Sequence, residues 1–599
     1  MKAPAHALYS LFLPRLKVFL LTIHTYSLHS TLMIKKLTTA ILALFSISVM
    51  ASAEVINVKP PKGDATQVLN AALRKASKAK GPVEIRLAPG TYNLSKEKSL
   101  VRYYRVSNTA SETEHKTANK HIGLLLKNLK HVTINGDGKA TLLTHGEMTP
   151  WVIDSCTDIR LTGLTVDAAD PSVPEMTVVE RTDNSILAKV NERSRYEIRD
   201  GKLYWKGFGW EFTDGIAQLF SPAKGTNLRC NSPVALAVNV EEVTPGTLRF
   251  SYSGNAPACA PGETFQMRHA IRSEVAGLVN RSTDVTLSGI RFKFMGNFGV
   301  VSQLSKNITI ENITCWADSA TNRTAVGFAD FFQVSSCGGL VRFDNCRFGS
   351  AHDDPINIHG THLKITEING NKLTARYMHH QTFGFLGFTE GDTVSVTDPA
   401  TLLPVGYFVV GSARMADERN TEITMEGFRP VEGAKVPASL KGMIVENRTW
   451  CPTVSITNSY FSLIPTRGIL VTTWRPVVIR NNRFVKCPMA AILIADDGRS
   501  WFESGAVENV TISGNVFEQC SNPVISIAPE NVLSDAGYVH RNITVTDNTF
   551  ISDRPVRIGV RSVDGFTFSG NKARTVSGTP QELLFDISSS ANVNLGQNR

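Results

Sequence analysis

The stretch Val510-Thr-Ile-Ser-Gly-Asn-Val-Phe517 holds the pattern that decides the fold, because the chain repeats it. Its form is apolar-x-apolar-x-Gly/Asn/Asp-Asn-x-Phe, and Ile543-Thr-Val-Thr-Asp-Asn-Thr-Phe550 follows the same form 33 residues later. The phrase ends at positions 22, 23, 33 or 34 residues apart: Phe292, Thr314, Phe348, then Phe461, Phe484, Phe517, Phe550 and Ala573. An internal period of this length indicates a repeat protein.

A second pair of apolar residues follows eight and ten positions after most of these phenylalanines. The pairs are Ile356/Ile358, Ile469/Val471, Ile492/Ile494, Ile525/Ile527 and Ile558/Val560. Two short alternating strands per repeat exclude a helical solenoid, whose units are longer and have helical periodicity. The pattern predicts an all-β fold, a parallel β-helix whose turn asparagines, among them Asn307, Asn312 and Asn542, form side-chain ladders.

The open end of a solenoid needs a cover, and the N-terminal sequence supplies one. The segment 63–76 predicts an amphipathic helix with Asp64 as N-cap and with Val68, Leu69, Ala72 and Leu73 on one face. A strand and a Gly-Thr-Tyr turn at 90–92 follow it. This phrase resembles the start of the pectin-lyase-like proteins, which implies a right-handed β-helix.

Residues 1–53 have the features of a leader. Met33-Ile-Lys-Lys is a basic n-region, Ala40 to Met50 is apolar, and Ala51-Ser-Ala53 is a small-x-small site, which together predict a signal peptide cleaved after Ala53. We expect translation to start at Met33; an unusually long leader or a membrane segment is the alternative. The apolar run is too short for a stable membrane span, so none is expected in the mature protein.

Two long insertions interrupt the period. Val166 to Phe292 spans 126 residues and Phe348 to Phe461 spans 113, and both insertions show strand-like alternation. Each is interpreted as a small β module that could wall a pocket. The predicted segments are the leader 1–53, the cap and first coils 54–166, a β module 167–283, coils 284–360, a second module 361–450, and coils 451–599.

Charge and cysteine content exclude some classes of function. Removing the leader takes away five basic and no acidic residues, which lowers the formal net charge from +10 to +5. No dense basic tract interleaved with aromatics is present, so nucleic acid is not an expected partner. Zinc-type cysteine and histidine spacings are absent, and no metal is predicted. Among the nine cysteines, Cys230 and Cys259 are the first candidates for a disulfide.

A cluster of carboxylates carries the predicted chemistry. In Ala351-His-Asp-Asp-Pro-Ile-Asn-Ile-His-Gly360, Asp353 and Asp354 are adjacent, and aligning Phe332/Val334 with Ile356/Ile358 places Asp330 beneath Asp354. The same column then continues to Arg467. With adjacent rungs about 4.8 Å apart, the two carboxyls could lie within roughly 5–6 Å. Such crowding is more typical of acid/base chemistry than of stabilisation, and two carboxylates flanking a bond are what glycoside hydrolysis needs.

Each of these residues has a structural alternative. A lone aspartate at a β-helix turn more often caps backbone amides, and Asp496-Asp497-Gly498 is interpreted as a solvated turn of that kind. His352 and Arg467 are predicted to bind substrate from their positions in the column. Trp316 is a candidate platform for a sugar ring, with buried packing as the alternative.

The leader, the coils, both insertions, Gly327-Phe-Ala-Asp330-Phe-Phe and the Asp353-Asp354 segment together resemble the exported bacterial α-1,3-galactosidases of glycoside hydrolase family 110. The resemblance covers roughly residues 54–599. It implies removal of terminal α-1,3-linked galactose from blood-group-B-type and linear glycans, with inversion and without a metal or other cofactor. It also implies Asp330, Asp353 and Asp354 as catalytic carboxylates, and export to the periplasm, cell surface or medium. The sequence leaves open whether the protein forms a homodimer.

Two rival functions remain. A polygalacturonase-like β-helix hydrolase would also pair an Asp-Asp with an upstream aspartate, but a polyuronate calls for several basic residues along the groove. Only Arg342, Arg347 and Arg467 lie near the Asp-Asp segment in sequence, which favours a neutral sugar. A non-catalytic glycan-binding protein or adhesin would bind without turnover.

Overall fold

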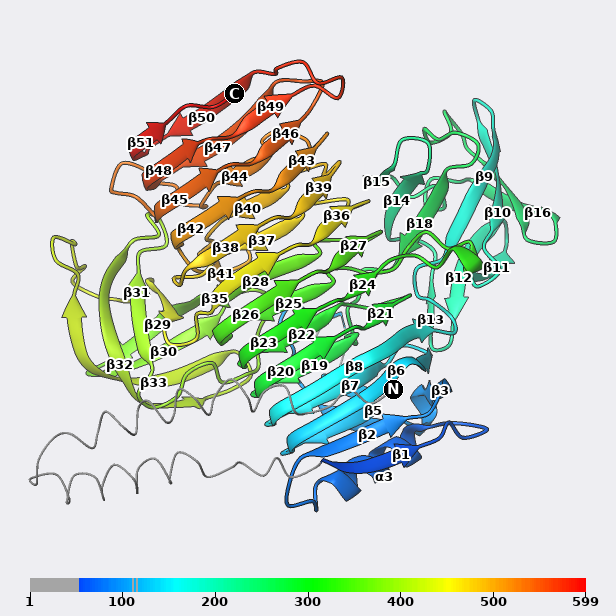
Figure 1. The fold of residues 1–599 in the computed structure, drawn as a ribbon, viewed down its shortest axis with the longest axis horizontal. Coiled ribbons are helices and arrows are strands. Elements are labelled where there is room, and N and C mark those ends of the chain that lie inside the picture. Colours follow the sequence, from blue (N-terminus) through cyan, green and yellow to red (C-terminus); the bar gives the residue numbers. More distant parts are fainter. Residues whose placement is uncertain (1–52, 110–112, 115–116) are drawn as a thin grey trace, which may run out of the picture. The chain divides into compact units, whose positions relative to one another are not determined.

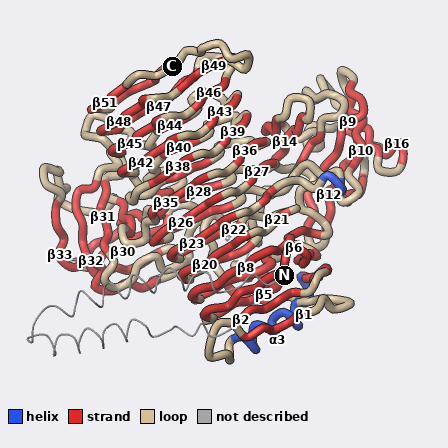
Figure 2. The backbone as a smooth tube through the Cα atoms, viewed as in Figure 1, coloured by secondary structure: helices blue, strands red, loops and turns tan. Residues whose placement is uncertain are grey.

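The computed structural model describes residues 53–109, 113–114 and 117–599. The predicted start at Met33 and the predicted signal peptide lie outside these residues, except for Ala53 at its end. Figure 2 shows that strands dominate the described chain, with helix confined to short segments. These are α3 (Thr66–Ala76), η1 (Lys96–Lys98) and η2 (Ser319–Thr321).

Most strands stack as the rungs of a parallel β-helix (Figure 1). Its longest sheet contains β1 (Glu54–Val58), β2 (Val83–Leu87), β3 (Gly90–Ser95), β6 (Lys130–His145), β8 (Thr157–Ala168), β20 (Thr283–Ser288), β21 (Arg291–Phe292), β23 (Lys306–Glu311), β24 (Thr314–Cys315), β26 (Gly338–Asp344), β27 (Arg347–Gly349), β35 (Thr453–Thr457), β36 (Tyr460–Ser462), β38 (Val477–Arg480), β39 (Arg483–Val485), β42 (Glu508–Ser513), β43 (Val516–Glu518), β45 (His540–Thr546), β46 (Thr549–Ile551), β48 (Val563–Ser569), β49 (Lys572–Arg574) and β51 (Ala591–Leu595).

A second sheet carries the other strand of each coil. It contains β4 (Leu100–Tyr103), β5 (Asn119–Lys127), β7 (Thr149–Asp154), β19 (Gly277–Asn280), β22 (Val300–Gln303), β25 (Phe332–Ser335), β28 (Ile356–Thr361), β37 (Ile469–Val471), β40 (Ile492–Ile494), β44 (Ile525–Ile527), β47 (Val556–Arg561) and β50 (Leu583–Ser588), with β41 (Glu503–Ser504) paired to β28. The apolar side chains of both sheets point into one continuous core.

The phenylalanine column of the repeat is confirmed. Phe461, Phe484, Phe517 and Phe550 pair in register on successive strands, and their rings stack with centroids 4.6, 5.1 and 5.0 Å apart. One member of the predicted column is wrong. Cys315, and not Thr314, pairs with both Phe292 and Phe348, because Cys315 is the residue whose side chain enters the core.

The predicted asparagine ladders are confirmed. Asn482, Asn515, Asn548 and Asn571 are buried, and each donates an Nδ2 hydrogen bond to the asparagine of the next rung at 2.9–3.2 Å. Asn307, Asn312 and Asn542 also bond to turn residues of neighbouring rungs, and all three have positive φ. These contacts satisfy turn groups that strand pairing leaves unbonded.

The N-terminal helix packs against the end of the core as predicted, although its first turn differs. Leu69, Ala72 and Leu73 are buried in the core, and Val68 packs beside them. The helix starts at Thr66 with Ala65 at the N-cap position. Asp64 instead accepts hydrogen bonds from the Thr66 amide and from Ser95, which tie the start of the helix to β3.

Two β modules interrupt the coils, on the right and the left of the β-helix in Figure 1. Module I has two antiparallel sheets. The seven-stranded sheet contains β9 (Glu175–Arg181), β10 (Ser185–Val190), β14 (Ile216–Ser221), β15 (Thr226–Cys230), β16 (Asn239–Thr244), β17 (Thr247–Ser251) and β18 (Thr264–Arg268). The three-stranded sheet contains β11 (Arg195–Arg199), β12 (Lys202–Gly207) and β13 (Trp210–Phe212). Module II is a closed barrel of β29 (Leu363–Asn369), β30 (Lys372–Tyr377), β31 (Thr393–Thr397), β32 (Pro404–Met415), β33 (Asn420–Pro430) and β34 (Ile444–Asn447).

Each module has a hydrophobic core of its own. Cys230 and Cys259 pack at the edge of the module I core as free thiols, so the disulfide expected between them is not formed in the structure. Within the described ranges, no helix is long and apolar enough to cross a membrane.

Candidate active site

Three adjacent strands of the second sheet bring the predicted column together. Phe332 pairs with Ile356 and Ile356 with Ile469, which confirms the register inferred from the sequence. Since Asp330, Asp354 and Arg467 each precede these residues by two positions, they occupy the same place on successive rungs. All three line a cavity of about 420 Å³, together with Asp353.

Asp354 is held at the floor of this cavity. It is 2% exposed, its Oδ2 lies 2.9 Å from the Arg467 guanidinium, and its Oδ1 accepts hydrogen bonds from Thr466 Oγ1 at 2.5 Å and the Arg467 amide at 3.0 Å. Burial raises the pKa of Asp354 to about 6, although the charge of Arg467 works in the opposite direction. Asp354 therefore changes its charge near neutral pH.

Asp330 has the more strongly perturbed carboxyl. It is buried, and this burial raises its pKa well above the usual range. The negative charges of Asp353 and Asp354 add to the increase, while Arg272 opposes it. A carboxyl that keeps its proton near neutral pH is suited to act as a general acid.

Asp353 lies beside the column and pairs with two arginines. Its Oδ2 is 3.1 Å from Arg229 of β15 and 3.5 Å from Arg272, which follows β18. The Arg272 guanidinium is fixed in turn over the Phe298 ring, 4.8 Å from its centroid. Module I and the segment that leaves it therefore supply both cations that face this carboxylate.

His352 does not line the cavity, contrary to the prediction that it binds substrate. Its Nε2 lies 3.0 Å from Gln266 Oε1, and its carbonyl accepts a hydrogen bond from Gln218 at 3.1 Å. Asn227 also donates to the Ala351 carbonyl at 3.3 Å. Burial lowers the pKa of His352 well below its usual value, so the ring is neutral. These contacts fasten the Asp-Asp turn to module I.

Trp316 also lies outside the cavity. The Arg347 guanidinium stacks over its ring at 3.7 Å, and Tyr460 is its aromatic neighbour at 6.1 Å. The ring covers Gly349, where an added Cβ would lie 2.4 Å from it. These contacts are those of the packing alternative for this half-buried ring, and its role as a sugar platform stays a prediction.

A further part of the cavity wall is not predicted by the sequence. Asp497, Trp501, Glu503 and Glu530 line it. Asp497 is 4% exposed, so the interpretation of its segment as a solvated turn is wrong. Its carboxylate accepts backbone hydrogen bonds from Arg499, Ser500, Trp501 and Phe502. The signal that could have revealed this wall is a tryptophan directly after a charged turn.

The pocket places differently perturbed carboxyl groups around one space. The pKa of Asp330 is raised well above its usual range, that of Asp354 is raised to about 6, and Asp353 forms ion pairs with Arg229 and Arg272. This combination supplies the acid and the base that single-displacement hydrolysis of a glycosidic bond requires. No group of three or more His, Cys, Asp or Glu side chains in the described residues is arranged to hold a metal ion.

The raised pKa of Asp330 predicts a cost in stability. The free energy of unfolding should fall as pH rises from the unfolded pKa towards the folded one, because the unfolded chain releases this proton while the buried carboxyl still holds it. We expect Asp330→Asn to raise the Tm, by more at about pH 8 than at about pH 4, since the amide does not titrate. Calorimetric scans at both pH values test this.

Asp344→Asn is the matched control, and its effect should have the opposite sign. Burial alone would raise the pKa of Asp344, but hydrogen bonds from Thr457 at 2.6 Å and Asn458 at 2.8 Å bring it below its usual value. This group stabilises the fold above its unfolded pKa, so its loss should lower the Tm at neutral pH. An equal decrease of the Tm in Asp330→Asn and Asp344→Asn would contradict the prediction that the buried Asp330 carboxyl lowers stability.

Comparison with known proteins agrees with this architecture. Residues 174–264 match the family model described as GLAA-B beta-barrel domain I, and residues 372–433 match GLAA-B beta-barrel domain II. Residues 420–576 match the right handed beta helix region. The fold is thus a right-handed parallel β-helix with two inserted β modules, as predicted.

Relatives extend over nearly the whole chain. Alpha-1,3-galactosidase A of Bacteroides thetaiotaomicron is 41% identical over 88% of this chain and 92% of its own, and the protein of the same name from Bacteroides fragilis is 35% identical over 82% of each. The solved family 28 exopolygalacturonase of Yersinia enterocolitica aligns over 91% of this chain and 78% of its own, with 11% identity and a TM-score of 0.39. On the identity and coverage of the first two relatives, the chain belongs to the family of the bacterial alpha-1,3-galactosidases.

Proposed function

We propose that this protein is an exo-acting α-galactosidase that removes terminal α-1,3-linked galactose from blood-group-B-type and linear Galα1-3Gal glycans, as a member of glycoside hydrolase family 110. The family relatives support hydrolysis of an α-galactoside. The observation that carries the mechanism is that the buried Asp330 and Asp354 and the half-buried Asp353 line one cavity.

The proposed reaction is a single displacement. Asp330 gives its proton to the glycosidic oxygen as the bond to the anomeric carbon breaks, and a water forms the new bond to that carbon from the opposite face. The Asp353 carboxylate, assisted by Asp354 above its pKa of about 6, takes the proton from that water. The products are β-galactose and the shortened glycan, so the anomeric configuration inverts.

The charges of the cavity favour a neutral sugar over a uronate. Six carboxyl groups line it, Asp330, Asp353, Asp354, Asp497, Glu503 and Glu530, against the three guanidinium groups of Arg229, Arg272 and Arg467. Each of these arginines lies within 3.5 Å of an aspartate oxygen. A carboxylate on the sugar would therefore have to displace an existing ion pair and approach further negative charge.

Substrate comparison tests this function. We expect free galactose from a Galα1-3Gal oligosaccharide and no product from polygalacturonate, with both followed by chromatography of released sugars. Release from polygalacturonate alone would replace the galactosidase proposal with the polygalacturonase-like alternative. Saturable binding of the oligosaccharide without any product would favour a glycan-binding protein.

We also propose export of the protein, on the leader-like sequence of residues 1–53. Expression of the full chain in a bacterial host should yield a mature protein that begins at Glu54. The intact mass and the N-terminal sequence of the exported chain check this, and an uncleaved cytoplasmic chain would contradict it.

A further inference from the structure

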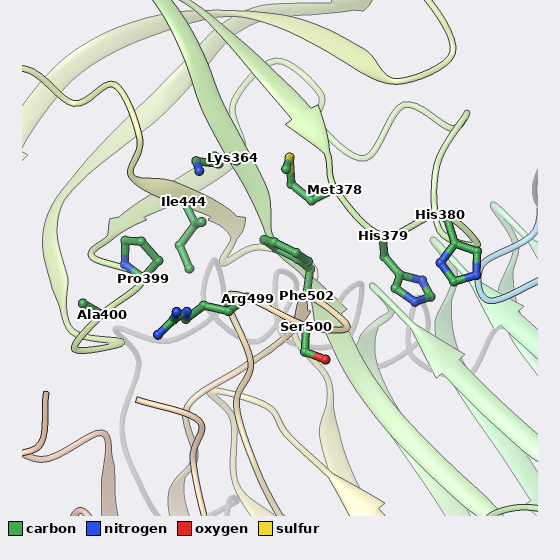
Figure 3. Close-up of a pocket in the computed structure, with 11 residues that line it drawn as sticks. Lys364, Met378, His379, His380, Pro399, Ala400, Ile444, Arg499, Ser500 and Phe502 are labelled. Carbon is green, nitrogen blue, oxygen red and sulfur yellow. The ribbon is translucent and has the colours of Figure 1, made fainter. Parts of the chain in front are cut away.

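A second cavity, of about 650 Å³, adjoins the loop that forms one wall of the aspartate pocket. One side of this second cavity belongs to module II, with Lys364, His379 and Ala400, and the other side is formed by Arg499 and Ser500 of the β-helix (Figure 3). Its size falls within the range of about 300–1,000 Å³ that is usual for ligand sites. Nothing in the proposed bond cleavage uses it.

One short loop separates the two cavities. Asp497 and Trp501 line the aspartate pocket, whereas Arg499, Ser500 and Phe502 line the second cavity. The Asp497 carboxylate holds this loop through the amides of Arg499 at 2.7 Å and Ser500 at 2.9 Å. Phe502 packs with Ile444 and Leu402, which anchors the loop to module II. The two cavities therefore share this loop as a common, anchored wall.

An exposed aromatic pair connects the two cavities. Trp501 is 42% exposed, while the other six tryptophans are buried or half-buried. Its ring stacks on His379, with centroids 4.4 Å apart and planes at 29°, and His379 lines the second cavity. Burial, with the charges of the adjacent His380 and Arg272, lowers the pKa of His379 to about 4, so the imidazole is neutral above that pH.

These features are those of a sugar-binding subsite. The apolar face of a pyranose can cover an exposed aromatic ring, and the ring next to the scissile bond would meet Trp501 at the mouth of the aspartate pocket. Beyond it, Lys364, Arg499 and Ser500 present hydrogen-bond donors around a space that no carboxylate of the described residues lines.

We propose that the second cavity binds the leaving-group side of the glycan, that is, the two or three sugars that remain after galactose is removed. Trp501 supports the sugar to which the galactose is attached, and the following sugars enter the cavity between module II and the Arg499 loop. The enzyme then discriminates among substrates by the length of this acceptor. The inference rests on the proposed galactosidase function.

Ala400→Trp tests the subsite by filling it. Ala400 lies on the cavity wall next to Pro399 (Figure 3) and outside the aspartate pocket. Ala438→Trp is the matched control, since Ala438 is an exposed alanine of the same module that lines neither cavity. The kcat/KM of wild type and both variants is measured on an α-1,3-galactosyl disaccharide and on a linear tetrasaccharide with the same terminal linkage.

We expect Ala400→Trp to lower kcat/KM on the tetrasaccharide by about tenfold, mainly through KM, and to leave the disaccharide within about twofold. Ala438→Trp should leave kcat/KM unchanged on both substrates. Equal values for the variant and wild type on the tetrasaccharide, or equal losses on both substrates, would overturn the subsite. Thermal unfolding of both variants reports whether the fold is intact.

A binding measurement separates failure of the subsite from failure of the proposed function. The trisaccharide left by hydrolysis of the tetrasaccharide is titrated into each protein by saturation-transfer NMR. Binding that Ala400→Trp abolishes supports the subsite even if no α-galactoside is hydrolysed, in which case the function is wrong. Turnover of α-galactosides with trisaccharide binding unchanged in Ala400→Trp rejects the subsite alone.

Discussion

Asp330→Asn should lower kcat on an α-1,3-galactosyl oligosaccharide by about 10²- to 10⁴-fold, the usual contribution of a positioned general acid. The asparagine preserves the size of the side chain but has no proton to give to the glycosidic oxygen. KM should change little, because the lost interaction acts in the transition state. Steady-state kinetics on the oligosaccharide measure both constants.

A better leaving group distinguishes an acid from a base. Dinitrophenolate departs without protonation, so Asp330→Asn should recover most of its activity on dinitrophenyl α-galactoside, whereas Asp353→Asn should stay inactive on both substrates. Selective recovery of Asp353→Asn would move the acid role to that residue.

Asp344→Asn provides the control for the chemical change itself. Asp344 lies at the end of β26 and lines neither cavity. Its variant should keep wild-type kcat on both substrates. A comparable loss in this variant would mean that the fall in Asp330→Asn reflects damage to the β-helix.

Arg467→Met should move the acidic limb of the activity profile to higher pH. Burial raises the pKa of Asp354 to about 6 while the Arg467 charge holds it down, so removing that charge should raise it further. Asp354 must be ionised to assist the base, and activity is lost as pH falls through this pKa. Below the limb, each unit of increase in this pKa costs about tenfold in rate. The measurement is kcat/KM between about pH 4 and pH 9.

Arg347→Met is the matched substitution for this experiment. Arg347 is exposed and stacks on Trp316 away from the pocket, so its loss should leave the pH profile in place. An unchanged acidic limb in Arg467→Met would show that Asp354 does not set it.

The β-helix and its catalytic column could be predicted because they repeat. Strand pairing transmits one register from rung to rung, so aligning Phe332 with Ile356 was enough to stack Asp330, Asp354 and Arg467. The alignment placed Thr314 in the phenylalanine column, although Cys315 occupies it. The strand there has only two residues, so it has no second core residue to fix its register.

The remainder of the site comes from segments outside the repeat. Arg229 and Arg272 reach Asp353 from module I and from the segment that follows it, more than 80 residues earlier in the chain. No period relates them to the coils. His352 and Trp316 lie near the site in sequence, but neither lines the cavity. Proximity in sequence does not determine towards which side of the chain a side chain points.

The Asp497 loop was misinterpreted for a related reason. Asp-Asp-Gly is typical of exposed turns, and only the packing of module II against this segment makes the turn part of a wall. Burial of Asp496 and Asp497 is therefore a tertiary property that local sequence does not express. The exposed Trp501 beside it was the one local sign of a binding surface.

The anomer of the first galactose released tests the account most directly. A Galα1-3Gal oligosaccharide is mixed with the enzyme, and ¹H NMR spectra are recorded before the product mutarotates. Single displacement by water between Asp330 and Asp353 predicts β-galactose first, with the α anomer growing only later. Initial release of α-galactose would contradict it, because retention requires one of these carboxylates to form a covalent intermediate.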